Sequence, residues 1–138
     1  MQYQLFDYFC LIDNLNFYLN QYLSRMFEDI YIEISMFKKN KEEIKPNINI
    51  ILKINGIEYE NLSYLSGGEK NRISLALTIS LNKLQGGSIL LLDEVMSSLD
   101  SYNRQECLKI LKKEGQDKVI LNICHETIEG YYDNIIDF

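Results

Sequence analysis

Two acidic residues at the end of an apolar run are the clearest candidates for chemistry in this sequence. The run is Ile89–Leu92, and Asp93 and Glu94 follow it directly. Four aliphatic residues after Gly86-Gly87 predict a strand buried on both faces, which is typical of parallel sheets covered by helices. Ligands bind at the carboxyl ends of such strands. One carboxylate there can hold a magnesium ion, and its neighbour can act as a base.

A second candidate is the start of the helix predicted from residue 67 to about residue 84. Ser66 and Glu69 have the spacing of a capping box, in which the serine accepts from a helical amide and the glutamate reaches back. This capping role accounts for both residues but leaves Gly67 and Gly68 unexplained, since two glycines cost backbone entropy without improving the cap. Bare amides at a helix start form an anion site, so this segment can also bind a phosphate.

Two further polar segments lie later in the chain. Residues 97–100 read Ser-Ser-Leu-Asp, and this can be a plain polar loop in which Asp100 caps the next helix, predicted from residue 102 to residue 113. Gly115 then lies near the predicted helix end. His125 lies just past Val119–Ile123, a second run typical of a buried strand. A lone histidine is usually a structural or exposed residue, so neither segment indicates a function on its own.

Taken in order, these segments resemble the C-terminal half of an ABC-type ATPase head. They match the family's signature motif (Leu65–Lys70), its Walker B strand (Ile89–Glu94), its D-loop (residues 97–100) and its switch histidine (Ile123–Glu126). The resemblance covers at least residues 61–138. The form Ser-Gly-Gly-Glu-Lys is more similar to SMC and SbcC-type DNA-repair ATPases than to transporters. Cys124 stands where the family often has threonine, which should affect packing more than chemistry.

The resemblance implies a role for each motif residue. Asp93 would hold Mg²⁺, Glu94 would be the general base, His125 would contact the γ-phosphate of ATP, and Asp100 would couple two sites across a dimer. The signature residues would meet the nucleotide of the opposite head, and they are Ser66, Gly67, Gly68 and Glu69.

The region before the signature motif predicts one helix and a small antiparallel sheet. Apolar residues at helical spacing between residues 5 and 27 indicate an amphipathic helix with one broad stripe. Alternating residues at 30–37 and 48–54 predict strands, and Asn55-Gly56 predicts a tight turn into residues 57–59. Residues 38–46 read as a charged loop and a local basic spot. Such runs are usually solvated loops, and the alternative is contact with DNA.

The predicted fold class is therefore α/β, in one domain. An amphipathic helix at residues 1–28, which the resemblance places at the root of a coiled coil, is followed by antiparallel strands at 29–60. Residues 61–138 then form the motif-bearing lobe of parallel strands with flanking helices. The helix after the signature motif is expected to be well buried, and residues 135–138 are expected to form a last strand.

The composition describes an ordinary globular protein. The 138 residues are 46% hydrophobic and carry a formal charge of −6, which argues against a generally basic nucleic-acid surface. Three cysteines without Cys-x-x-Cys spacing suggest neither a disulfide framework nor a zinc site. With no basic leader ahead of an apolar core and no membrane-length apolar run, we expect an intracellular location, cytoplasmic or nuclear.

A phosphate-binding P-loop requires a Gly-Lys dipeptide, and these residues contain none. The resemblance therefore implies a partner lobe that supplies the P-loop, with ATP and Mg²⁺ as cofactors and no hydrolysis by this chain alone. It further implies a second head, a nuclease subunit and DNA bound through the full complex. Two alternatives stay open. One is a non-catalytic interaction module, and the other is a nucleotide-binding subunit of an ABC transporter.

Overall fold

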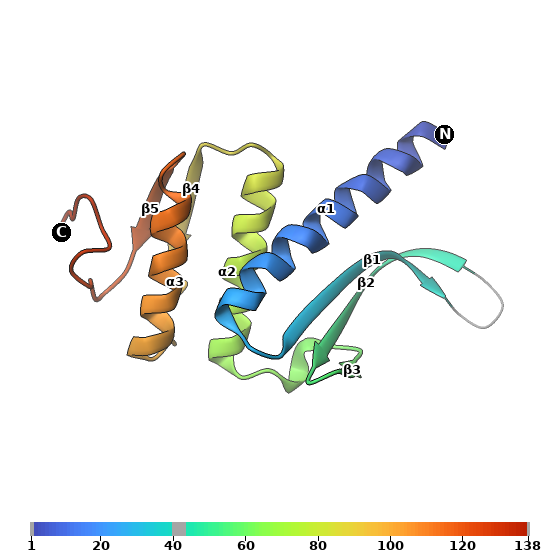
Figure 1. Ribbon diagram of the computed structural model, residues 1–138, viewed down its shortest axis with the longest axis horizontal. Helices are drawn as coiled ribbons and strands as arrows, with labels where there is room; N and C mark the ends of the chain where they lie inside the picture. Colours follow the sequence, from blue (N-terminus) through green and yellow to red (C-terminus); the bar gives the residue numbers. More distant parts are fainter. Residues whose placement is uncertain (1, 40–43, 138) are drawn as a thin grey trace. The chain divides into compact units, whose positions relative to one another are not determined.

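The computed structural model describes residues 2–39 and 44–137 of the 138-residue chain. The chain divides into two structural units, Met1–Ser66 and Gly67–Phe138. The first unit contains helix α1 and a three-stranded sheet, and the second contains helices α2 and α3 with a two-stranded sheet (Figure 1). The predicted α/β class, with an antiparallel segment followed by a parallel one, is confirmed.

Helix α1 (Gln2–Met26) confirms the predicted amphipathic helix, but only its second half is buried. Its apolar stripe packs there against the first strand of the sheet, and the buried residues are Leu15, Leu19, Tyr22, Leu23 and Met26. Towards the N-terminus the stripe continues in exposed residues, among them Tyr8, Phe9 and Leu11. The single broad stripe of the sequence is therefore buried in the core from Leu15 to Met26, about three helical turns, and exposed before them.

The first sheet is antiparallel, in the order β1-β2-β3. Its strands are β1 (Ile30–Lys39), β2 (Ile44–Ile54) and β3 (Ile57–Tyr59). Asn55 and Gly56 both have positive φ, of 51° and 78°, which confirms the predicted turn. The strands run further than predicted, because residues 38–39 and 44–46 belong to the ladder and not to a charged loop. The rest of that predicted loop, residues 40–43, lies outside the described residues.

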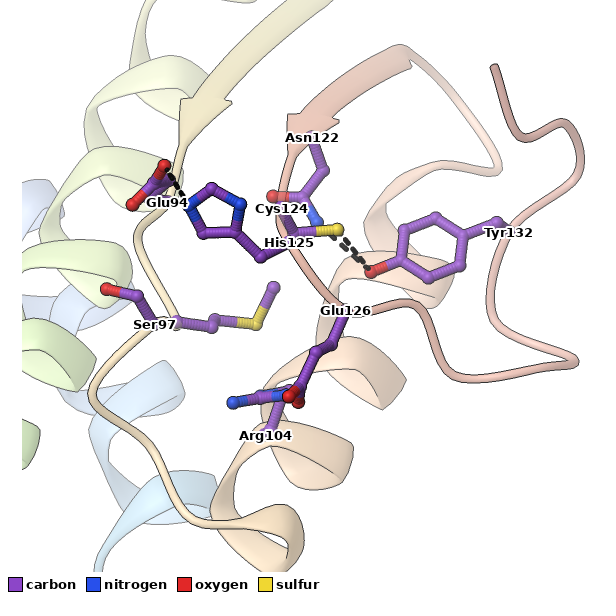
Figure 2. A pocket seen from close by; sticks show the side chains of 9 residues that line it. Glu94, Ser97, Arg104, Asn122, Cys124, His125, Glu126 and Tyr132 are labelled. Carbon is purple, nitrogen blue, oxygen red and sulfur yellow. Dashed lines mark hydrogen bonds and ion pairs between the residues drawn. The ribbon is translucent and has the colours of Figure 1, made fainter. Parts of the chain in front are cut away.

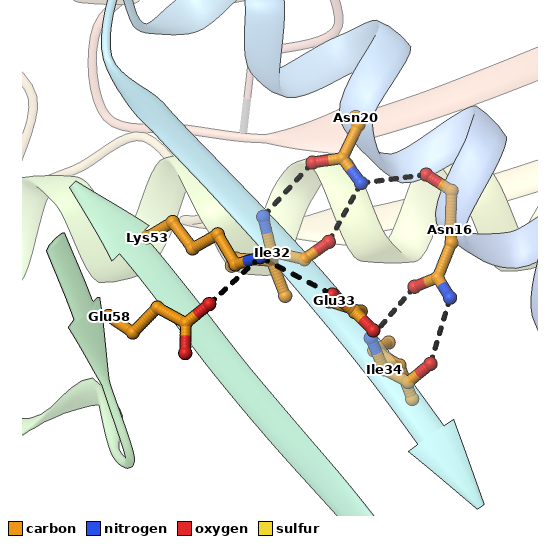
Figure 3. Close-up of polar contacts among 7 residues, drawn as sticks. All are labelled: Asn16, Asn20, Ile32, Glu33, Ile34, Lys53 and Glu58. Atoms are coloured by element: carbon orange, nitrogen blue, oxygen red, sulfur yellow. Dashed lines mark hydrogen bonds and ion pairs between the residues drawn. The ribbon is translucent and has the colours of Figure 1, made fainter. Parts of the chain in front are cut away.

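Two asparagines of α1 close the free edge of β1 (Figure 3). The Asn20 side chain accepts from the Ile32 N–H at 3.0 Å and donates to the Ile32 carbonyl at 2.7 Å. Asn16 makes the same pair of bonds with Ile34, both at 2.8 Å. Each amide thus replaces one residue of a neighbouring strand. Because an unpaired strand edge can recruit another chain, these contacts protect the sheet and fix α1 to it.

We predict that Asn20→Ala lowers the free energy of unfolding by about 2 kcal/mol or more, since it leaves a backbone donor and acceptor of Ile32 unpaired at a partly buried edge. Urea denaturation followed by circular dichroism measures this loss. The matched control is Asn14→Ala, on an exposed position of the same helix, which should be neutral. Equal stability of the two variants would show that the edge contacts do not stabilise the sheet.

The second unit places two parallel strands beside two helices. The helices are α2 (Gly67–Leu84) and α3 (Ser101–Glu114), and the strands are β4 (Ile89–Asp93) and β5 (Val119–Ile123). The strands pair in register from Ile89 opposite Val119 to Asp93 opposite Ile123. Both strands and α3 confirm the prediction to within a residue or two.

Burial of the parallel strands on both faces was predicted, and this is wrong for the described residues. Leu90 and Leu92 are buried, but the side chains between them are exposed, and alternate residues of β5 are exposed as well. The reason is the pleat, which sends successive side chains to opposite faces while one face alone is covered. The exposed apolar residues are Ile89, Leu91, Val119, Leu121 and Ile123.

One smaller prediction is wrong. Residues 135–137 form no strand, because β4 and β5 are the only strands of this sheet in the described residues and the segment joins no ladder. Residue 138, the end of that predicted strand, lies outside the described residues. Helix α2 is well buried in its middle, as predicted, at Ile73, Leu75, Ala76, Ile79 and Ser80, whereas Leu81 near its end is exposed.

Candidate functional site

The carboxyl ends of β4 and β5 bring together two residues that lie 31 positions apart in the sequence. His125 Nε2 lies 2.8 Å from Glu94 Oε1 (Figure 2). Asp93 is the last residue of β4 and lies opposite Ile123 in the ladder. The predicted placement of Asp93, Glu94 and His125 at one edge of a parallel sheet is therefore confirmed.

The backbone of Glu94 turns the chain at this edge. Its φ is +49°, in the left-handed region that residues other than glycine rarely adopt. Its N–H donates to the Ile123 carbonyl at 2.9 Å, and its own carbonyl accepts from Ser97 N–H at 3.0 Å. The first bond extends the β4–β5 ladder by one residue, and the second closes the turn that follows it. Backbone strain of this kind is concentrated at functional sites and is held by the surrounding bonds.

The site is open to water. The side chains of Glu94 and His125 are 45% and 81% exposed, and Asp93 is exposed too. An exposed pair of this kind contributes little to stability because water screens it. The contact between Glu94 and His125 is therefore available for exchange with a ligand.

A pocket of about 220 Å³ lies beside this pair. Its lining consists of Glu94, Met96, Ser97, Arg104, Asn122, Cys124, His125, Glu126 and Tyr132. The amide of Asn122 donates to the Tyr132 hydroxyl at 3.1 Å, and Cys124 Sγ lies 3.7 Å from the same oxygen. Burial, together with the Cys124 contact, raises the pKa of Tyr132 to about 12, so the hydroxyl stays protonated.

Arg104 also lines the pocket, and sequence reasoning assigned it no role. Its guanidinium donates to the Leu99 carbonyl at 3.2 Å and forms an ion pair with Glu126, the residue after His125. Tyr132 and Asn122 were missed as well. Tyr132 lies in an irregular segment, where no periodicity predicts which way a side chain points.

The start of α2 contacts the D-loop-like segment. The position of a Cβ on Gly68 would be 3.6 Å from both Leu99 Cδ2 and the Ser98 carbonyl, an ordinary contact, and a Cβ on Gly67 would meet nothing within 4 Å. Neither glycine has positive φ. Packing and backbone geometry therefore leave both glycines unexplained. Ser66 directly precedes the helix, as the capping prediction requires.

Asp100 caps helix α3, as predicted. Its carboxylate accepts from the Asn103 N–H at 2.9 Å and from the Asn103 amide at 2.7 Å. The Asn103 side-chain oxygen in turn accepts from Arg72 of α2 at 2.8 Å. The bond from the Asn103 N–H is the main cause that holds the pKa of Asp100 below its usual value.

A lowered pKa means that the folded state prefers charged Asp100. The stability that charged Asp100 gives the folded state is complete above the ordinary aspartate pKa of about 3.9. It is lost as the pH falls through the lower pKa that Asp100 has in the folded state. We predict that the melting temperature of the wild-type chain falls more steeply below pH 4 than that of Asp100→Asn. Thermal melts from pH 2 to pH 7 test this. Parallel curves for the two proteins would contradict the link between cap and charge.

The side chains at this edge of the sheet can supply only part of the coordination shell of a magnesium ion. Within residues 2–39 and 44–137, no group of three or more His, Cys, Asp or Glu side chains is placed to hold a metal ion. Mg²⁺ usually takes one or two carboxylates and completes its shell with water and phosphate oxygens. Exposed Asp93 can supply one such carboxylate.

Across the described residues, no helix is both long and apolar enough to cross a bilayer.

Comparison with known proteins shows the family of the chain. The family model described as the RecF/RecN/SMC N terminal domain matches residues 9–132. The chain is 32% identical over 137 residues to uncharacterized protein 050L of Invertebrate iridescent virus 6, covering 91% of this chain and 13% of that protein. It is 35% identical over 106 residues to methionine import ATP-binding protein MetN 1 of Bacillus thuringiensis, covering 73% and 30%. The chain thus spans a minor part of these relatives.

Solved SMC heads share the fold. A structure from work on ATP-driven dimerization and DNA-stimulated activation of SMC ATPases matches with a TM-score of 0.73 and 16% identity, covering 91% of this chain and 76% of that one. The SMC head domain from Thermotoga maritima matches with a TM-score of 0.58 and 28% identity, covering 82% and 38%. The chain therefore belongs to the RecF/RecN/SMC family and has the fold of an ABC-type SMC ATPase head.

Proposed function

We propose that this chain is the C-terminal lobe of an ATP-hydrolysing head in an SMC- or SbcC-like complex for DNA recombination or double-strand-break repair. The observation that carries the proposal is the contact between Glu94 and His125 at the carboxyl edge of two parallel strands. In the proposed reaction, a base and a histidine act side by side at the γ-phosphate of a nucleotide. The surrounding motifs occur in the family order.

Three residues at the strand ends would act on one nucleotide. Asp93 would hold Mg²⁺, through water, and the metal would neutralise phosphate charge. Glu94 would accept a proton from the attacking water, with the His125 ring beside it. His125 would donate to the γ-phosphate. Such catalysis consists mainly of positioning and charge stabilisation, which suits a site built on strand ends.

The signature residues Ser66, Gly67, Gly68 and Glu69 would act on the nucleotide of a second head. Support comes from Gly67, beside which a Cβ would meet nothing, so no local packing requires a glycine there. Glycine in a first helical turn lowers stability, but it allows another group to approach the backbone closely. A phosphate at the amides of a helix start is such a group. Asp100 would couple the two sites across the dimer.

The open face of the β4–β5 sheet supports a partner lobe that carries the P-loop. Its five apolar side chains, at residues 89, 91, 119, 121 and 123, are 55–69% exposed. Parallel sheets normally have both faces covered, and a contiguous apolar patch of this kind marks an interaction site. The proposed occupant of this face is the P-loop lobe. DNA and a nuclease subunit would bind the completed complex and not this acidic chain alone.

One specific observation favours a second candidate, the nucleotide-binding subunit of an ABC transporter. The 35% identity to MetN 1, a methionine import ATP-binding protein, covers 73% of the chain. Against it stands the region before the signature motif, where, in the described part of the chain, α1 leads into antiparallel strands and no further α-helix precedes α2. The gene next to this one discriminates between the two. A P-loop with long heptad repeats supports repair, and a membrane-spanning neighbour supports transport.

We predict that the chain alone does not bind Mg-ATP at micromolar concentrations and that a P-loop lobe added in trans restores binding. Positioning fails when most nucleotide contacts belong to another lobe. Isothermal titration calorimetry measures both. Leu91→Asp should block association of the lobe, whereas Ile48→Asp, equally exposed but in the first unit, should not. One tight ATP site on the isolated chain would refute the lobe assignment.

We predict that Glu94→Gln in a reconstituted head lowers ATP turnover by about 10²-fold or more and preserves ATP-dependent dimerisation, because it removes the base and keeps the shape. Steady-state hydrolysis and size-exclusion chromatography with ATP give the two readouts. Glu129→Gln, an exposed position of the same unit, is the control. Near-normal turnover in Glu94→Gln would exclude this residue as the base.

A further inference from the structure

Arg104 connects three separate segments of the second unit. It lies in the first turn of α3, where its own N–H donates to the Asp100 carbonyl at 2.9 Å. Its guanidinium bonds the Leu99 carbonyl, in the segment before the helix, and Glu126, in the segment after β5. The Arg104 side chain is 18% exposed, so most of it is withdrawn from water.

The two partners of Arg104 adjoin the proposed site on both sides. Leu99 belongs to the loop that ends at Asp100, and its side chain is buried. Glu126 directly follows His125. Arg104, Glu126 and His125 all line the pocket that also contains Glu94 (Figure 2). The guanidinium therefore links the 97–100 loop to the segment that carries His125.

An arginine suits this task because its five N–H donors point in fixed directions in one plane. Two partners bound to one guanidinium are held at a set distance and angle. A lysine has one flexible ammonium group and cannot reproduce that fork. The backbone carbonyl of Leu99 gives a fixed reference point, and Glu126 is the movable partner, being 76% exposed.

Resting on the proposed function, we propose that Arg104 is a positioning residue that ties the 97–100 loop to the His125 segment and so holds His125 in line with Glu94. The role proposed for it is positioning and not direct contact with substrate or metal. It acts through Glu126 on one side and the Leu99 carbonyl on the other. Displacement of the 97–100 loop, the segment assigned to the contact with a second head, then reaches His125 through one side chain.

The plain alternative is an incidental surface ion pair. Such a pair exists on the same helix, between Lys109 and Glu106 at 2.6 Å. It spans three residues within one helix, and both side chains are partly or largely in water, so it contributes little. The Arg104 contacts differ in that they join segments 22 residues apart and include a backbone carbonyl.

His125 is the sole histidine of the chain, which gives a direct readout without nucleotide. We expect Arg104→Lys and Glu126→Gln each to move and broaden the ring signals of His125 in proton–carbon NMR spectra of the full chain. Lys109→Gln is the matched control and should leave them in place. Glu126→Gln changes an exposed side chain, so it stays folded even if an Arg104 variant does not, and thermal melts verify this.

The double variant separates coupling from independent effects. If Arg104 acts on His125 through Glu126, the shift in Arg104→Lys/Glu126→Gln is smaller than the sum of the two single shifts. Unmoved His125 signals in both folded single variants would overturn the proposal. So would shifts of equal size in the Lys109→Gln control.

A second arm tests the consequence for catalysis in a head completed with its P-loop lobe. Misplacing a catalytic group lowers kcat and leaves substrate binding intact, so Arg104→Lys should lose about tenfold or more in kcat with KM unchanged. A rise in KM with kcat unchanged would overturn the positioning role. If the wild-type head hydrolyses no ATP, the proposed function fails while the NMR result still decides the link between Arg104 and His125.

Discussion

The second unit depends on the parallel pairing of β4 with β5. Parallel strands end at the same edge, so the pairing of Asp93 with Ile123 carries Glu94 and His125 to within hydrogen-bond distance. An antiparallel pairing would place them at opposite ends of the strands. The left-handed backbone of Glu94 follows from the same arrangement, because its N–H completes the ladder before the chain turns away.

The two units differ in whether their open sheet surfaces are covered. In the first unit the free edge of β1 is occupied by the amides of Asn16 and Asn20, which satisfy four backbone groups. In the second unit an apolar sheet face is left exposed over both strands. This face presents apolar side chains, which need no hydrogen-bond partners. Such a surface can be buried against another protein. The contrast supports the proposal that the second unit is one part of a larger head.

The charged residues of the candidate site lie at the protein surface, and this agrees with the phosphoryl-transfer chemistry proposed for it. Glu94, His125 and Asp93 are open to water, and they are brought together by the ends of two paired strands. Phosphoryl transfer requires little covalent chemistry from the protein and much alignment. A site assembled from two lobes and two heads would gain that alignment only when it closes, which makes the segments that join strand ends to loops the natural place for control.

The sequence alone determined the order and type of the elements and the motif residues, because these depend on local periodicity, caps and turns. Asn55-Gly56, the Asp100 cap and the two apolar strands were all predicted from neighbouring residues. The exposed sheet face, the asparagine contacts at β1 and the links of Arg104 and Tyr132 were decided by tertiary structure. Each depends on which distant segment meets a side chain, and a long arginine or an asparagine amide can reach many partners. Residues 135–137 show the same limit, since an apolar run becomes a strand only where another strand is present to pair with it.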